Sequence, residues 1–144
     1  MILNFIWNLK HGLLFVQTLC NMKKRVLIAD DDEGIRDVLT MILERAGYEV
    51  ELWPNGSFIH EQSERYPDIY LIDRQMPDSD GLDVCRQLKL NETTSSIPVI
   101  MISATPNIKQ LSVEAGANAS IEKPFEIAHL LEKIGECIGK DSRA

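Results

Sequence analysis

Short apolar runs alternate along this chain with segments that repeat apolar residues every three or four positions. The short runs are typical of buried strands, and the longer segments are typical of amphipathic helices. The expected strands are 26–29, 48–53, 69–72, 98–102 and 119–122, and the expected helices are 35–46, 57–66, 81–90, 106–116 and 127–138. Such strict alternation favours a parallel sheet with helices on both faces, because parallel neighbours need crossover connections.

The predicted fold class is therefore α/β, a doubly wound five-stranded parallel sheet. In the common strand order 2-1-3-4-5, the first and third strands flank the topological switch point, and ligands bind beyond the carboxyl ends of the strands. We therefore expect the chemistry of this protein at the residues that follow each strand.

Composition narrows the class of function. The 144 residues suit one globular domain, and a net charge of -7 would repel nucleic-acid phosphates and anionic membrane surfaces, so no nucleic acid and no membrane is expected as a partner. The cysteines and histidines are scattered and lack the spacing of a zinc site. The cysteines, three in number and without a C-x-x-C pair, fit reduced thiols in the cytoplasm.

Residues 1–22 do not match the rest of the chain. They are apolar but interrupted by polar residues such as Asn4, Asn8 and Lys10, so they are too broken for a spanning helix and lack the pattern of a signal peptide. We interpret them as an N-terminal extension, either disordered or upstream of a true start at Met22, with docking on a membrane or partner as the alternative. The folded domain is expected at 23–140, with a tail at 141–144.

Polar residues directly follow four of the predicted strands. Asp30 and Asp31 follow the first, Asp73 the third, Ser103 the fourth, and Lys123 the fifth. Carboxylates that converge on one crevice repel one another unless a cation joins them, and hard oxygen ligands suit Mg²⁺. One carboxylate could then attack phosphorus while the lysine and the hydroxyl bind the remaining phosphoryl oxygens.

The segments VLIADDD, LIDRQMPDSDG, PVIMISA and IEKPF, in this order at the strand ends, resemble the receiver domain of two-component response regulators. The resemblance covers about residues 23 to 139 and implies the flavodoxin-like receiver fold. It implies a stand-alone signalling domain rather than an enzyme, with only self-phosphotransfer and autodephosphorylation, because after Lys123 about one helix of chain remains.

The resemblance also implies roles for individual residues. Asp73 would accept a phosphoryl group from a sensor histidine kinase or a histidine phosphotransfer protein, and Ser103 and Lys123 would contact that group. Lys123-Pro124 matches a peptide bond that this family often holds cis. The implied ligands of Mg²⁺ are the side chains of Asp31 and Asp73, Asp30 through water, and the backbone carbonyl of Gln75.

Nearby acidic residues have simpler interpretations. Asp32 and Glu33 are expected in the cap and first turn of the first helix, and Asp78 and Asp80 as turn and cap residues before the third. Cys85 and Cys137 fall on apolar helix faces and are expected in the core.

The chain departs from the family at two places. Receivers usually carry Tyr or Phe three positions before the lysine, where this chain has Ser120, and the segment from Ser103 to Gly116 is about two residues short, which predicts a reduced fourth helix. The aromatic switch therefore cannot operate in its usual form. We expect the domain to pass on its signal by docking on an unknown downstream protein or by transferring phosphate onward in a relay.

Three other functions were weighed against a phosphorylated receiver. A phosphatase of the haloacid dehalogenase type would need Thr or Val at Gly34 and a late acidic pair, which are missing. A receiver-like module that binds partners constitutively would fit Ser120, and phosphate uptake distinguishes it. A nucleotide- or flavin-binding function would need a glycine-rich loop after the first strand, and the sequence has none there.

Overall fold

The computed structural model describes residues 22–61 and 63–141 and confirms the doubly wound sheet. Its five parallel strands lie in the order β2-β1-β3-β4-β5, as predicted. The strands are β1 (Arg25–Ala29), β2 (Glu49–Trp53), β3 (Ile69–Asp73), β4 (Val99–Ser103) and β5 (Ala119–Glu122). The helices are α2 (Glu33–Arg45), the 3₁₀ turn η1 (Ser57–His60), α3 (Gly81–Leu90), α4 (Ile108–Glu114) and α5 (Ile127–Asp141). Every strand begins and ends within one residue of its predicted bounds.

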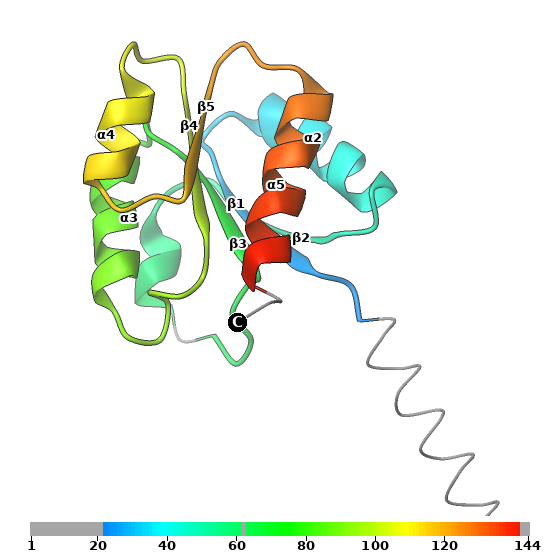
Figure 1. The fold of residues 1–144 in the computed structure, drawn as a ribbon, viewed down its shortest axis with the longest axis horizontal. Coiled ribbons are helices and arrows are strands. Elements are labelled where there is room, and N and C mark those ends of the chain that lie inside the picture. Colours follow the sequence, from blue (N-terminus) through cyan, green and yellow to red (C-terminus); the bar gives the residue numbers. More distant parts are fainter. Residues whose placement is uncertain (1–21, 62, 142–144) are drawn as a thin grey trace, which may run out of the picture.

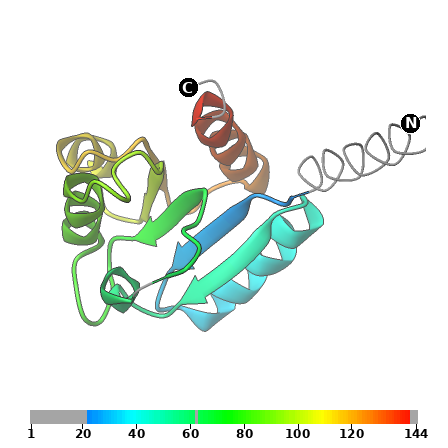
Figure 2. The ribbon, with the colours of Figure 1, turned by 90° about the horizontal axis from the view of Figure 1, so that it is seen from below.

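The sheet has a hydrophobic core on each face, because successive side chains of a strand point to opposite sides. Figure 1 shows α2 and α5 on one side of the strands and α3 and α4 on the other. The view in Figure 2, turned by 90°, also separates the two pairs of helices. Val26 and Ile28 of β1 pack toward α2 and α5, whereas Leu27 and Ala29 pack toward η1, α3 and α4.

The strand register brings the carboxyl ends of the central strands into line. Asp73 lies beside Ile102, and Ser103 lies beside Glu122. Both β3 and β4 are buried along their whole length, which explains their continuous apolar runs. The polar residues that end these strands therefore emerge together at one edge of the sheet.

The second predicted helix was wrong in length. The structure has only the 3₁₀ turn Ser57–His60, and Glu61 already has extended backbone angles. Farther along, the hydroxyl of Ser63 donates to the carbonyl of Arg65 and accepts from its amide nitrogen. Such local bonds from a side chain to the backbone compete with helical hydrogen bonds.

The helix α4 is shorter than the predicted segment 106–116, because it ends at Glu114 and begins at Ile108 rather than at Pro106. Asn107, between them, has a φ of 65° in the left-handed region, and its side chain makes no capping bond. This turn separates Pro106 from the helical residues. At the other end the chain leaves the helix through Gly116, whose φ is 85°.

Residues 1–21 and 142–144 lie outside the described residues, and with them nearly all of the predicted extension and tail. Over the described ranges, no helix combines the length and the apolar character needed to cross a membrane.

We predict that Leu43→Ala lowers the free energy of unfolding by about 2–5 kcal/mol, because Leu43 is fully buried between α2 and the sheet and its removal leaves a cavity. Leu90→Ala is the matched control, since Leu90 is 84% exposed at the end of α3 and its loss should change stability by no more than about 0.5 kcal/mol. Urea denaturation measures both. Equal effects of the two substitutions would contradict the assigned core.

Candidate functional site

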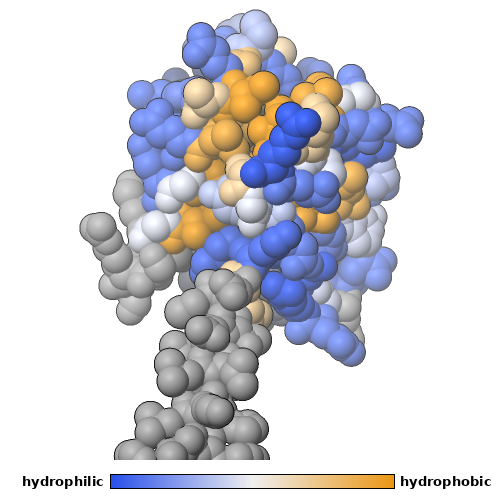
Figure 3. Space-filling model, turned by 90° about the vertical axis from the view of Figure 1, so that its right-hand side faces the viewer, coloured by the Kyte–Doolittle hydropathy of each residue, from blue (hydrophilic) through white to orange (hydrophobic). Residues whose placement is uncertain are grey.

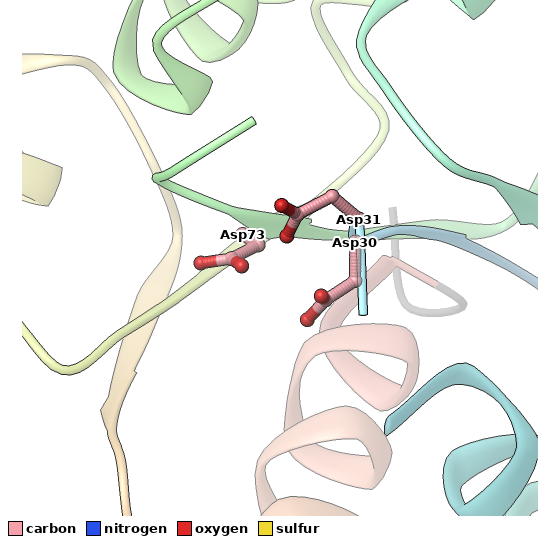
Figure 4. Close-up of side chains that lie close together, drawn as sticks. All are labelled: Asp30, Asp31 and Asp73. Atoms are coloured by element: carbon pink, nitrogen blue, oxygen red, sulfur yellow. The ribbon is translucent and has the colours of Figure 1, made fainter. Parts of the chain in front are cut away.

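Three aspartates meet at the carboxyl ends of β1 and β3. Each of Asp30, Asp31 and Asp73 offers a carboxylate oxygen, and these atoms all lie within 4.8 Å of one another. Figure 4 shows Asp30 and Asp31 at the end of one strand and Asp73 at the end of its neighbour. Asp30 is 2% and Asp73 is 7% exposed, whereas Asp31 is open to solvent. The cluster is therefore a set of hard oxygen donors with one accessible side.

Lys123 connects two of these aspartates. Its Nζ lies 3.3 Å from Asp30 Oδ2 and 3.4 Å from Asp73 Oδ2. The backbone nitrogen of Lys123 donates to the carbonyl oxygen of Ser103 (2.9 Å), which ties the residue to the end of β4, and the peptide bond to Pro124 is cis, as the resemblance implied. One ammonium group therefore offsets part of the charge of two nearly buried carboxylates.

Asp30 is held in place by the start of α2. Its Oδ1 accepts from the amide nitrogen of Asp32 (2.9 Å), and its backbone carbonyl accepts from Arg36 Nη1 (2.6 Å). The side chain of Asp32 caps α2 by accepting from the amide nitrogen of Ile35, as predicted. The role of Arg36 was not predicted, because an arginine in the first turns of a helix gives no sign that it turns back to the preceding strand.

Burial raises the pKa of Asp73 above its ordinary value of 3.8, and the neighbouring charge of Asp30 raises it further. The ammonium of Lys123 and a hydrogen bond from the amide nitrogen of Gln75 to Asp73 Oδ1 (3.4 Å) act in the opposite direction. The net upward shift means that the folded site disfavours the negative charge of Asp73. A bound cation would favour the deprotonated form.

The loop after β3 places Gln75 beside the cluster. Gln75 forms an isolated antiparallel bridge with Asp80, while its amide nitrogen is directed to Asp73. Asp80 caps α3 through the amide nitrogen of Leu82, as predicted. Asp78 accepts from the amide nitrogen of Gly56, a residue distant in sequence.

Gly81 keeps this loop close to the end of β3. Its amide nitrogen donates to the carbonyl of Arg74 (2.7 Å), and a Cβ atom at this position would overlap with the backbone oxygen of Asp73. From the sequence, Gly81 was predicted only as the start of a helix. Its position after an acidic turn was a signal of close backbone approach that the sequence alone could not distinguish from a helix start.

Ser103 is buried at the end of β4, and its hydroxyl bonds to the next loop. It donates to Thr105 Oγ1 (2.8 Å) and accepts from the amide nitrogen of Thr105 (3.0 Å). Ser103 and Lys123 thus lie at the same edge of the sheet as the aspartates. Of the other residues named from the sequence, Cys85 is fully buried and Cys137 partly buried, and Ser120 lies in β5 beside Met101.

Comparisons with known proteins bear on this site. Residues 26–135 match the family model of the response regulator receiver domain. The DNA-binding dual master transcriptional regulator RpaA of Synechocystis sp. is 34% identical over 124 residues, which cover 83% of this chain and 51% of that protein. The chain spans about half the length of the curated relatives it matches.

Solved structures are similar over most of the chain. A CheY-like response regulator receiver domain protein from Methanospirillum hungatei JF-1 is 30% identical, has a TM-score of 0.77, and aligns over 85% of this chain and 98% of its own. The receiver domain of a sensor histidine kinase from Pseudomonas aeruginosa PAO1, solved with a magnesium ion coordinated in its active site cleft, is 25% identical. Its TM-score is 0.74, over 82% of this chain and 99% of its own.

We predict that Asp73→Asn stabilises the protein at pH 7 in buffer without divalent cations. The raised pKa means that the folded state disfavours the carboxylate at every pH above its ordinary value of 3.8, and asparagine removes that charge. The gain should shrink as the pH falls through the folded pKa and vanish below about 3.8, where Asp73 is protonated in both states. Urea midpoints across this range measure the difference, with the exposed Asp37→Asn on α2 as control. A stabilisation by Asp73→Asn that persists in acid would show that it does not come from removal of the Asp73 charge.

We predict that Gly81→Ala lowers the free energy of unfolding by about 1–3 kcal/mol, because the added methyl group pushes against the backbone of Asp73. Gly135→Ala in α5 is the control: a Cβ there meets no atom within 4 Å, and alanine should stabilise the helix by up to about 1 kcal/mol. Thermal or urea unfolding measures the stability of both variants. We expect the free energy of unfolding to fall for Gly81→Ala and to rise for Gly135→Ala. A Gly81→Ala variant as stable as the unchanged protein would contradict the close approach.

Proposed function

Because this chain belongs to the response regulator receiver domain family, we propose that Asp73 accepts a phosphoryl group from a phosphohistidine. The donor would be a sensor histidine kinase or a histidine phosphotransfer protein. The observation that supports this proposal most strongly is the convergence of three carboxylates and Lys123 at one edge of the sheet. Asp73 is the carboxylate that both the lysine and the Gln75 amide approach.

The donor set fits Mg²⁺, which prefers oxygen ligands and binds through one or two carboxylates while it keeps several waters. We propose that Asp31 and Asp73 bind the ion through their side chains, Asp30 through water, and Gln75 through its backbone carbonyl. The charge excess of three carboxylates over one lysine supports this assignment, and the Pseudomonas receiver domain offers a parallel. When bound, the ion would offset the carboxylate charge and polarise the phosphoryl oxygens.

In the proposed reaction, a carboxylate oxygen of Asp73 attacks phosphorus and forms an acyl phosphate. The bond between phosphorus and the imidazole nitrogen of the donor breaks, and its electron pair stays on the imidazole. Lys123 already lies 3.4 Å from Asp73 and can pair with a phosphoryl oxygen. Ser103 can donate its hydroxyl hydrogen to another oxygen once it leaves Thr105. Hydrolysis of the acyl phosphate would return Asp73 to its resting state.

The output of this exchange would be a protein contact or transfer of the phosphoryl group to another histidine. The acidity of the sequence supports a protein partner over nucleic acid for these residues. Because position 120 holds serine, we propose that the signal leaves through the Ser103–Thr105 bond and the short helix α4, which directly follows that loop. We place the exchange in the cytoplasm, where reduced thiols such as Cys85 and Cys137 persist.

The experiment is incubation of the full chain with Mg²⁺ and acetyl phosphate, followed by intact mass. We expect one added phosphoryl group on the protein and on Asp83→Asn, and none on Asp73→Asn or after chelation of Mg²⁺. Lys123→Ala should slow the reaction by roughly 10²–10³-fold, as expected for loss of one charged stabilising group. Modification that survives in Asp73→Asn, or none in any of these proteins, would sink the proposal and leave a constitutive binding module.

A further inference from the structure

A small cavity of about 150 Å³ lies between η1 and the C-terminal end of α3, away from the carboxylate cluster. Its floor is formed by side chains that are each no more than 7% exposed, namely Phe58, Tyr70, Leu88 and Thr94. Its rim carries the exposed side chains of Glu61, Tyr66, Gln87 and Asn91. A largely apolar floor with a few polar groups is typical of a site for a small ligand.

The groove between α2 and α5 is a hollow of a different kind. It is larger, about 650 Å³, and its walls include Ile35, Val38 and Phe125. Figure 3 looks onto this face and shows apolar residues gathered in its upper half, bordered by hydrophilic ones. Of the described residues that line the groove, none has a buried polar side chain. The groove therefore offers apolar surface, whereas the cavity beside η1 also offers a buried polar group.

That group is the hydroxyl of Tyr70. Tyr70 is 2% exposed, and its hydroxyl makes no hydrogen bond with any of the described residues. The other buried hydroxyl of the floor does have a partner, because Thr94 Oγ1 donates to the carbonyl oxygen of Leu88 (2.7 Å). Buried tyrosine hydroxyls usually have a hydrogen-bond partner. The hydroxyl of Tyr70 is therefore free to bind a polar atom inside the cavity.

This hydroxyl is a hydrogen-bond donor at neutral pH. Burial raises the pKa of Tyr70, and the nearby groups of Tyr66 and Glu51 raise it further. The phenol therefore keeps its proton, and the atom that it contacts in a ligand has to be an acceptor. Tyr66 lines the same cavity, which agrees with a hydroxyl of Tyr70 that points into it.

Aromatic rings and size define the rest of the ligand. The rings of Phe58 and Tyr70 stack, with centroids 5.6 Å apart and planes at 24°. A further ring can pack against such a pair by offset stacking or edge to face. A cavity of about 150 Å³ is the size that holds one benzene molecule in an engineered protein. The cavity therefore suits a single six-membered ring.

The charges around the cavity disfavour an anion. Glu61 is charged and lines it, and no lysine or arginine is among the described residues that do so. Glu51, which is close enough to raise the pKa of Tyr70, pairs with Arg25 Nη2 at 3.4 Å. A ligand carboxylate or phosphate would meet Glu61 without a compensating cation in the wall. A neutral ligand avoids that repulsion.

We propose that this cavity binds a small neutral aromatic molecule, a single ring that carries a hydrogen-bond acceptor. The ring packs against Phe58 and Leu88, and the acceptor takes the hydrogen of the Tyr70 hydroxyl. The site is separate from the carboxylate cluster, because Tyr70 lies near the start of β3 and Asp73 at its end. The proposal goes beyond the phosphotransfer and does not rest on it.

Titration of the full chain with phenol, followed by the amide chemical shifts in NMR spectra without any phosphoryl donor, tests the proposal. We expect saturable binding with a dissociation constant of about 1 mM or lower, a value within reach of so small a ligand. The largest shifts should fall in η1, at Tyr70 and at the end of α3. Toluene, which has the same ring without the acceptor, serves as the comparison ligand.

Tyr70→Phe removes only the hydroxyl. We expect it to weaken phenol binding by about three- to tenfold, the loss expected for one hydrogen bond, and to leave toluene binding unchanged or tighter. Tyr48→Phe is the matched control, since Tyr48 is partly buried on the other face of the sheet and should leave both affinities unchanged. Circular dichroism checks that both variants fold.

Three results would overturn the proposal. The first is an absence of saturable shifts with phenol. The second is shifts confined to another surface, such as the groove between α2 and α5. The third is phenol binding that Tyr70→Phe and Tyr48→Phe leave equally strong. Phosphorylation of Asp73 is not measured in these experiments, so failure of the proposed phosphotransfer leaves their outcome unchanged.

Discussion

The site depends on the repulsion among three carboxylates that the sheet forces together. Parallel strands end at one edge, and the register of β1, β3 and β4 leaves Asp30 and Asp73 almost without solvent. Lys123 reaches both at 3.3 and 3.4 Å, yet one ammonium cannot balance three negative groups. Burial raises the pKa of Asp73, and the neighbouring charge of Asp30 raises it further. A bound divalent cation would offset this excess of negative charge.

Much of this arrangement could be predicted from the sequence because it depends on local patterns. Continuous apolar runs predicted strands buried on both faces, and the polar residue after each run predicted where chemistry would gather. The caps at Asp32 and Asp80 followed from short acidic side chains before an apolar helix pattern. The helix after Trp53 was harder to predict. Ser63 uses its hydroxyl to bond the local backbone, and the helix stops after one turn.

Contacts between distant elements could not be predicted in this way. The bond from Arg36 back to Asp30 and the close approach of Gly81 to Asp73 depend on how a helix is seated against a strand end. The partner of Ser103 is Thr105, two residues on, and this pairing depends on the course of the loop into α4. The apolar groove between α2 and α5 likewise appears only when two helices that lie far apart in sequence are brought side by side.

Titration of the Asp73 carboxyl carbon by NMR, with and without Mg²⁺, tests the charge balance most directly. Without divalent cations, we expect Asp73 to titrate above its ordinary value of 3.8, and Mg²⁺ should move the titration to lower pH. An Asp73 that titrates at its ordinary pH and ignores Mg²⁺ would contradict the account, because the carboxylates would then neither repel one another strongly nor share a cation.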